Sequence, residues 1–229
     1  MLPSPPSSVD RMAKSIWPTD DQTQTLLDNA RAGDVDAVNQ LLDRHRRSVR
    51  RLVEMRLDRR VQQRVDVSDV VQDVMVEASG RLDKYLDDPA MAFHLWIRQI
   101  AWDRIIDTYR RHRVSAKRNM DREQPIAVAG TDQSTMELAV QLRDPGVTPA
   151  TAATQREIAK QVESVIELLN EQDREIILMR HYEHLSNLEI AEVLQLNPPA
   201  ASMRYLRALR RLRQLLAEHD VDASGETVQ

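Results

Sequence analysis

The sequence of 229 residues contains no cysteine. Disulfides, thiolate catalysis and cysteine-based zinc sites are therefore excluded. Glycine is scarce, at 5 residues, and phenylalanine occurs once; leucine, arginine, alanine and valine abound, and this composition favours helices over sheets. No apolar run is long enough to cross a membrane. The N-terminal "MLPSPPSSVD" lacks the basic and apolar regions of a signal peptide. We therefore expect a cytoplasmic protein with no membrane contact.

The net charge of −4 conceals a strong segregation of charge along the chain. Eight arginines and two acids lie between Arg44 and Arg60, whereas seven acids and two bases lie in residues 66–88. Residues 98–118 hold seven Lys or Arg, and residues 204–213 hold five arginines and no acid. Basic and acidic segments on one chain indicate more than one kind of partner.

Apolar residues recur at helical spacing in two blocks of the chain, and no strand pattern is evident. We predict an all-α protein of two small helical domains, at residues 22–113 and 155–217, joined by a flexible linker. Prolines, glycines and polar residues interrupt the linker, 114–154, which leaves room for one short helix near 136–142. Residues 1–21 and 218–229 are predicted to be disordered.

The clearest amphipathic helix is predicted over residues 66–80. Asp66 or Ser68 would cap its start, and Gly80 would end it. Its polar residues lie three or four positions apart, which places them on one side of the helix. These residues are Asp69, Gln72, Asp73 and Glu77. From the residues alone, such a side is most simply a solvated acidic surface.

The segment from Ser186 to Leu216 contains two helix starts. "SNLE" is a capping box, in which the Ser186 side chain bonds to the backbone N–H of Glu189 and the Glu189 side chain bonds to the backbone N–H of Ser186. Further on, Asn197 is a candidate N-cap, and Pro198 falls at the first helical position, where its missing N–H does no harm. Two helices joined by a short turn, with the second one basic, predict a helix-turn-helix. The outer side of the second helix would carry Ser202, Met203, Arg204, Arg207, Arg210 and Arg211.

Three stretches in order resemble the extracytoplasmic-function (ECF) sigma factors of bacterial RNA polymerase. "DVSDVVQDVMVEA" resembles the family's acidic helix, and "FHLWIRQIAWDRIIDTYRRHR" resembles its tryptophan-containing helix. "LNEQDREIILMRHYEHLSNLEIAEVLQLNPPAASMRYLRALRRLRQLL" resembles its C-terminal helix-turn-helix. The resemblance covers residues 22–113 and 155–217, which would correspond to sigma regions two and four.

This resemblance implies a role for each stretch. The acidic helix, with Asp69, Gln72, Asp73 and Glu77, would bind the clamp-bearing largest subunit of core RNA polymerase. The helix-turn-helix would read the minus-thirty-five element as duplex DNA, and the flap-bearing subunit would be a second polymerase partner. Whether an anti-sigma protein binds is left open. The tryptophan-containing helix would bind and open the minus-ten promoter element through Arg98, Trp102, Arg104, Arg110, Arg111 and Arg113.

The sequence departs from the family pattern at three places. Asp103 replaces an asparagine, which puts an acid near DNA. Gln195 replaces the glycine of the turn and must accept a backbone angle that glycine adopts more easily. "PAAS", residues 199–202, replaces Gly-Thr-Val-Lys at the start of the recognition helix, so fewer side chains there can contact DNA.

Two other classes of protein compete with this interpretation. A free-standing helix-turn-helix regulator would need neither the acidic helix nor the tryptophan-containing helix. An enzyme would need a site, and His181 and His184, three apart, have no further ligands nearby. No glycine-rich phosphate loop or nucleophile elbow occurs. We therefore expect no catalysis, no metal and no cofactor.

Overall fold

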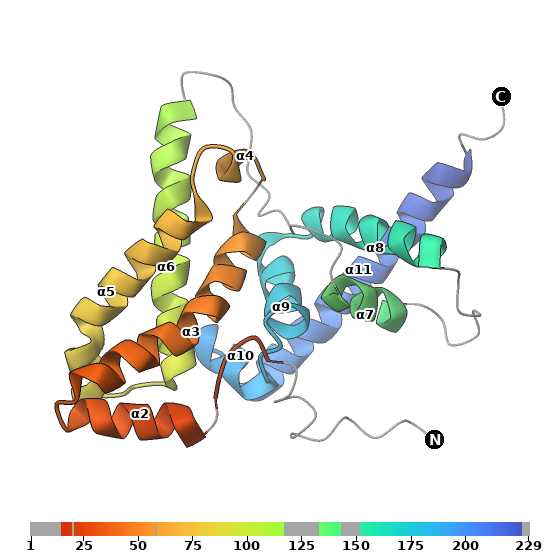
Figure 1. The fold of residues 1–229 in the computed structure, drawn as a ribbon. Helices are drawn as coiled ribbons and strands as arrows, with labels where there is room; N and C mark the ends of the chain where they lie inside the picture. The colour runs from red at the N-terminus through yellow and green to blue at the C-terminus, as the bar shows by residue number, and fades with distance from the viewer. Residues whose placement is uncertain (1–14, 20, 58, 117–132, 143–151, 226–229) are drawn as a thin grey trace. The chain divides into compact units, whose positions relative to one another are not determined.

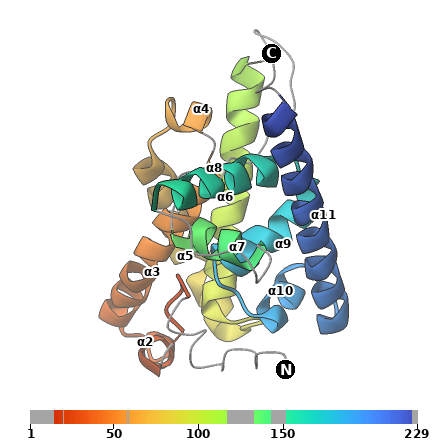
Figure 2. The same ribbon diagram turned by 90° about the vertical axis from the view of Figure 1, so that its right-hand side faces the viewer.

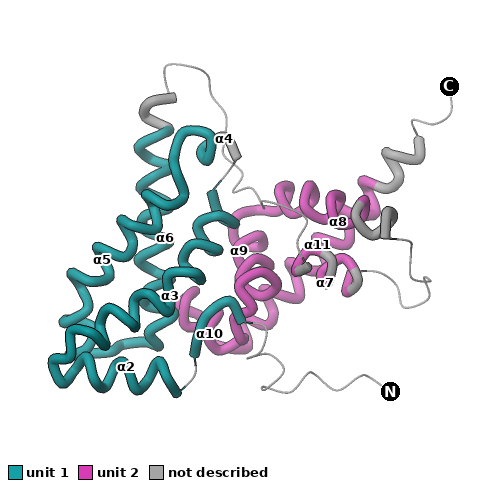
Figure 3. The backbone as a smooth tube through the Cα atoms, viewed as in Figure 1, with its two compact units in different colours: residues 1–129 teal, residues 130–229 magenta. Residues whose placement is uncertain are grey.

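The computed structural model describes residues 15–19, 21–57, 59–116, 133–142 and 152–225. All regular structure within these ranges is helical, as predicted. The chain forms two compact units, residues 1–129 and 130–229 (Figure 3). No helix within the described ranges combines the length and apolarity needed to cross a membrane.

The first unit is built around α3 (Val35–Arg56), which packs against α2 (Asp21–Arg31), α5 (Val67–Asp87) and α6 (Phe93–Ala116) (Figure 1). A single turn, α4 (Arg59–Gln62), joins α3 to α5. The chain turns between α2 and α3 at Gly33, which has φ +92°, and Asp34 caps α3 by accepting bonds from the amides of Asp36 and Ala37. The core of the unit includes the fully buried Leu41, Leu52, Val74, Ile97 and Ile105.

The start of α5 agrees with the prediction, but its end does not. Asp66 is the N-cap and accepts a hydrogen bond from the Ser68 amide (2.7 Å). The helix then continues through Gly80 to Asp87. A glycine inside a helix costs about 1 kcal/mol relative to alanine. Leu82 and Tyr85, both buried, extend the apolar stripe beyond it and offset that cost.

The expectation of disorder over residues 1–21 is wrong for residues 15–19, and α2 already begins at Asp21. Trp17 is only 2% exposed. Ser48 on α3 donates a hydrogen bond to the carbonyl of Ile16, and the His45 ring lies 3.2 Å from the carbonyl of Pro18. Burial of an indole and these polar contacts offset the entropy lost on ordering so short a segment. Residues 1–14 lie outside the described residues.

The second unit contains α7 (Gln133–Leu142), α8 (Ala152–Glu167), α9 (Glu171–His181), α10 (Asn187–Val193) and α11 (Pro198–Gly225). The long α11 packs on α8, α9 and α10, and its first turns lie beside α10 in both views (Figures 1 and 2). The short helix expected in the linker is α7, and it packs on α8 and α9 as part of this unit.

Two predicted boundaries change in this region. The helix α11 continues to Gly225, so the expected disorder of residues 218–229 is wrong for 218–225. The linker predicted at 114–154 loses its first and last residues to α6 and α8, because 114–116 and 152–154 are helical. The rest of that linker outside α7, residues 117–132 and 143–151, lies outside the described residues, as do residues 226–229.

Arg174 on α9 stabilises the end of α8 in a way that the sequence did not reveal. Its buried guanidinium donates hydrogen bonds to the carbonyls of Ile166, Glu167 and Leu169. The last carbonyls of a helix lack partners within the helix. A basic side chain from the next helix therefore supplies those partners and also faces the negative end of the helix dipole.

Candidate functional site

The polar side of α5 presents three of its four predicted residues to solvent. Asp69, Gln72 and Asp73 are exposed, and on the opposite side Val70, Val71 and Val74 are buried. The exposed three therefore lie on a firmly packed helix and are free of the core. Such a surface can bind a basic partner without rearrangement.

Glu77, the fourth predicted residue, has a different environment. Its side chain is only 14% exposed, and its carboxylate forms ion pairs with Arg81 on the same helix and with Arg104 on α6. Arg104 also lies 3.7 Å from Asp107. Glu77 and Arg104 were predicted to contact polymerase and DNA respectively; instead they join α5 to α6.

The basic residues predicted along α6 divide into buried and exposed groups. Arg98 was expected to face DNA. It is only 3% exposed and has a partner within the chain, so it does not lie on an open surface. The reason is its position four residues after His94, which is also buried, on a side of α6 that packs inward. Arg110 and Arg111 are exposed near the end of α6. The Arg113 side chain lies outside the described residues.

The two tryptophans of α6 have unequal access to a hollow. Trp102 is half-buried, and the Arg56 guanidinium carbon lies 5.0 Å from the centre of its ring. Trp96 is also half-buried, but it borders a hollow of about 530 Å³ between the end of α5 and the start of α6. The sequence placed Trp102, and not Trp96, among the residues expected to bind the minus-ten element. The position of Trp96 at this hollow favours the opposite assignment.

The hollow combines aromatic rings with basic side chains. The ring centres of Tyr85 and Trp96 are 4.8 Å apart, and the Tyr85 hydroxyl donates to the carbonyl of Met91 (3.0 Å). Arg81 and Lys84 also line it. Burial raises the pKa of Tyr85, which keeps its hydroxyl protonated. Stacking surfaces beside cations are the combination that accommodates an unpaired nucleotide. The sequence signal that could have identified this hollow is the pair of aromatic residues Tyr85 and Trp96, which lie on either side of Pro89.

The helix-turn-helix has the capping that the sequence predicted. The Ser186 hydroxyl and the Glu189 amide are 3.3 Å apart, and the Glu189 carboxylate accepts from the Ser186 amide at 2.6 Å. Asn197 accepts from the Ala200 amide at 2.8 Å, and α11 begins at the next residue, Pro198. Pro198 therefore lies at the start of a helix, as predicted, and Pro199 follows it within the first turn.

The turn between α10 and α11 closes with Gln195 in the left-handed conformation, φ +53°. The Gln195 amide donates to the carbonyl of Glu192 (3.1 Å), and the Leu196 amide donates to that of Ala191 (2.8 Å). These two bonds form a Schellman motif, whose left-handed position is usually glycine. The expectation that Gln195 must accept a glycine-like backbone angle is confirmed.

The outer side of α11 carries the residues predicted to contact DNA, with different degrees of exposure. Met203, Arg207, Arg210 and Arg211 are exposed, whereas Ser202 and Arg204 are half-buried. The Ser202 hydroxyl donates to the Asn187 side chain (3.2 Å), whose amide donates in turn to the carbonyl of Pro198 (3.1 Å). Ser202 therefore helps to fix α10 against the start of α11.

His181 takes part in an interhelical contact. Its Nε2 lies 3.0 Å from the Tyr205 hydroxyl, which also accepts a hydrogen bond from Gln141 (3.3 Å). Burial lowers the pKa of His181 to about 4, so the ring is neutral at pH 7, and burial also raises the pKa of Tyr205. These contacts join α7, α9 and α11. Among the described residues, no cluster of His, Asp and Glu could hold a metal ion.

Comparison with known families matches both units. The family described as Sigma-70 region 2 matches residues 39–114, and that described as Sigma-70, region 4 matches residues 159–212. The first match covers α3 to α6, including the exposed acids of α5, and the second covers the helix-turn-helix. The protein is therefore a sigma factor of RNA polymerase.

Individual relatives specify the subfamily. The chain is 33% identical over 153 residues to the RNA polymerase sigma factor CnrH of Cupriavidus metallidurans, covering 66% of this chain and 73% of that protein. It is 27% identical over 153 residues to the ECF RNA polymerase sigma factor SigW of Bacillus subtilis, covering 67% and 76%. The ECF RNA polymerase sigma-E factor of Haemophilus influenzae is 26% identical over 185 residues, covering 81% and 90%.

A solved structure supports the same conclusion. The structure of CnrH in complex with the cytosolic domain of CnrY is similar to this chain, with a TM-score of 0.53 and 26% sequence identity. The similarity covers 86% of this chain and 99% of the CnrH chain. The chain belongs to the ECF family of RNA polymerase sigma factors.

Proposed function

We propose that this sigma factor binds core RNA polymerase through the exposed side of α5, and that Asp69, Gln72 and Asp73 make the principal contacts. The observation that supports this proposal is that the three side chains are solvent-exposed on a helix whose other side is buried. This helix lies within the residues that match Sigma-70 region 2. The clamp-bearing largest subunit is the proposed partner, as the family resemblance implies. Promoter selection of this kind needs binding alone, so we expect no catalysis, and we expect the protein to act in the cytoplasm with the polymerase.

A binding assay with purified core polymerase tests this proposal. We expect the triple variant Asp69→Ala, Gln72→Ala, Asp73→Ala to bind core polymerase about tenfold more weakly or worse, because charge complementarity is lost at the contact. The matched control is Asp36→Ala, Gln40→Ala, Asp43→Ala, which removes the same three side-chain types from the exposed side of α3. Equal binding by both triple variants would refute the proposed surface.

The minus-ten element would be opened at the hollow between α5 and α6. The half-buried Trp96 offers a stacking surface for one unpaired base, the buried Tyr85 packs against its ring, and Arg81 and Lys84 lie beside it for the phosphate. The exposed Arg110 and Arg111 would hold the DNA backbone farther along α6. Each stacked base contributes about 1–3 kcal/mol by alanine substitution.

A fluorescent base placed at successive positions of the minus-ten element tests the choice of tryptophan. We expect Trp96→Ala to reduce promoter opening by about tenfold or more, and Trp102→Ala to reduce it less, provided both variants bind core polymerase normally. The reverse ranking would return the stacking role to Trp102.

The minus-thirty-five element would be read by α11. Its first turns carry the Met203 and Arg204 side chains towards base edges, and Arg207, Arg210 and Arg211 would contact phosphates. The flap-bearing polymerase subunit is a further proposed partner, as the family resemblance implies, and we propose an anti-sigma protein as another. The polymerase-binding assay also separates this function from that of a free-standing regulator, which would bind promoter DNA without core polymerase.

A further inference from the structure

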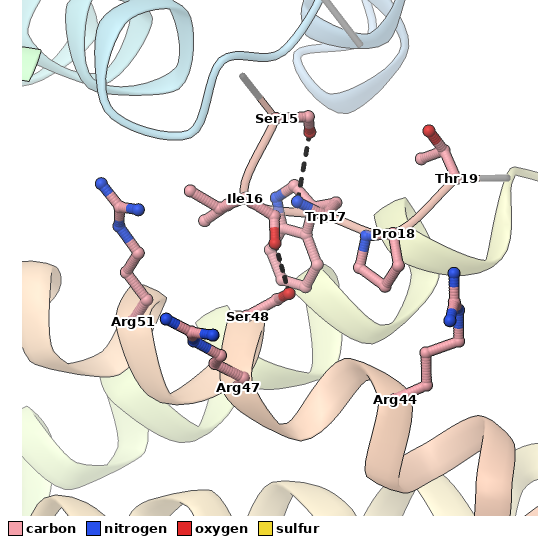
Figure 4. Close-up of a pocket in the computed structure, with 9 residues that line it drawn as sticks. All are labelled: Ser15, Ile16, Trp17, Pro18, Thr19, Arg44, Arg47, Ser48 and Arg51. Carbon is pink, nitrogen blue, oxygen red and sulfur yellow. Dashed lines mark hydrogen bonds between the residues drawn. The ribbon is translucent and has the colours of Figure 1, made fainter. Parts of the chain in front are cut away.

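A basic hollow of about 500 Å³ lies between residues 15–19 and α3 (Figure 4). Three arginines of α3 line it, Arg44, Arg47 and Arg51, and their spacing of three and four residues places them on one side of the helix. None of the nine described residues that line the hollow is acidic. The function proposed above assigns no role to this concentration of positive charge.

One wall of the hollow is held in place from several directions. The Trp17 ring is buried, and the carbonyls on either side of it, those of Ile16 and Pro18, are bound by Ser48 and the His45 ring of α3. Arg44 is positioned by the Thr23 hydroxyl (3.1 Å) and the Gln22 side chain (2.6 Å). A ligand that entered here would therefore find a preformed surface, which lowers the entropic cost of binding.

The hollow contains hydrogen-bond donors that lack acceptors. The indole N–H of Trp17, a residue only 2% exposed, has no acceptor among the described residues. Arg47 is exposed and forms no ion pair or hydrogen bond with any other residue that the structure describes. A buried donor without an acceptor is unfavourable and requires an explanation. Three guanidiniums with no acidic side chain beside them match a ligand with several acceptor oxygens and negative charge.

We infer that this hollow binds phosphate groups. From Arg44 to Arg51 the helix advances about 10 Å, which is more than one phosphate occupies. Two sources share this chemistry: a small polyphosphate, and the backbone of nucleic acid. The second source would add a promoter contact on α3, and only that choice of source rests on the proposed function. Guanidinium groups suit both, because they form paired hydrogen bonds with phosphate oxygens.

The indole signals of the full-length protein provide a direct readout. The chain has three tryptophans, so its ¹⁵N spectrum contains three indole N–H signals, and Trp17→Phe assigns the one of interest. The probes are sodium pyrophosphate and a single-stranded DNA oligonucleotide, each titrated at low salt. We expect the Trp17 signal to shift and saturate with at least one probe, and the shift to weaken as salt is raised.

Two double variants of α3 give the decisive comparison. Arg47→Ala with Arg51→Ala should weaken the Trp17 response by about tenfold or more, since two charge-assisted contacts are lost. Arg46→Ala with Arg50→Ala removes the same charge from the same helix at two positions that do not line the hollow, where the arginines form ion pairs with Asp43 and Glu54. That control should bind within about twofold of the unaltered protein.

The outcomes separate clearly. Saturation by pyrophosphate supports a small-polyphosphate site, and saturation by DNA alone supports a backbone contact. No shift of the Trp17 signal with either probe, or equal loss in the two double variants, would overturn the inference. Core polymerase binding is measured in parallel. If the unaltered protein fails to bind polymerase while Trp17 still responds to phosphate, the proposed function fails and the phosphate site stands.

Discussion

The carboxylate of Glu77 on α5 forms an ion pair with the guanidinium of Arg104 on α6. The side chains of both residues are mostly covered, at 14% and 28% exposure. The helix proposed to bind polymerase and the helix proposed to open the promoter are therefore joined by a charge pair, and the sequence assigned its two members to different partners. The exposed acids of α5 remain available for a protein partner, while Glu77 is used within the unit.

The Glu77–Arg104 pair should be measurable as a coupling energy. In a double-mutant cycle with Glu77→Gln and Arg104→Gln, we expect a favourable interaction of about 1 kcal/mol in the free energy of unfolding. Glutamine removes the charge at both positions and keeps the volume of the glutamate; the shortening of Arg104 is common to the single and double variants and cancels in the cycle. Urea unfolding of the four proteins measures the cycle. Strictly additive effects would mean that the pair contributes no net stability.

Gln195 should be replaceable by glycine with a gain in stability. Its φ of +53° is unfavourable for a residue with a Cβ and free of strain for glycine. We expect Gln195→Gly to raise the free energy of unfolding by about 0.5–1 kcal/mol, after glycine's greater entropy in the unfolded chain is included. The matched control is Gln214→Gly in the exposed part of α11, which should lower stability by about 1 kcal/mol. Thermal unfolding that ranks these two variants the other way would contradict the assignment.

Arg174 should be among the most sensitive positions of the second unit. Arg174→Met keeps the apolar stem of the side chain but removes all the hydrogen bonds to the end of α8. We expect a loss of about 2–3 kcal/mol, because the carbonyls of a helix end would lose their charged donor in a buried setting. Arg210→Met, at an exposed position of α11, should change stability by less than about 0.5 kcal/mol. Chemical unfolding followed by circular dichroism distinguishes the two.

His45 should make the first unit sensitive to acid. Burial, with smaller contributions from the nearby His94 and Arg44, lowers the pKa of His45 from 6.5 to about 4. The unfolded chain therefore takes up a proton between pH 6.5 and 4 that the folded chain does not. The stability contributed by the neutral ring is complete above pH 6.5 and is lost as the pH falls towards 4.

The experiment compares unfolding at pH 7 and pH 5 for the unaltered protein and His45→Gln. At pH 5 we expect the histidine to account for a loss of roughly 1–2 kcal/mol that the variant does not show. A proton NMR titration of the His45 ring should give a midpoint near 4, with the chain still folded. A midpoint near 6.5 would show that the ring is accessible to water and would contradict its burial.

Local chemistry determined much of what the sequence predicted correctly. Asp66, Ser186 and Asn197 cap helices because their side chains bond to amides two or three residues away, and nothing distant is needed. The same holds for Pro198 at a helix start. Helical periodicity identified α5, and its exposed acids follow from the same spacing. Three ordered motifs then indicated the family, which the matches to both regions confirm.

Only the tertiary structure decided the features that depend on residues far apart in the chain. Gly80 does not end α5, because Leu82 and Tyr85 find partners in the core. Trp17 is ordered because α3 supplies its pocket and its hydrogen bonds, and Arg98 is buried because its side of α6 packs inward. Burial and ion pairing depend on neighbours that only folding brings together, whereas caps and turns are contacts between residues a few positions apart. The sequence by itself therefore determined the helices and the family, and the packing decided which charged side chains remain free to bind a partner.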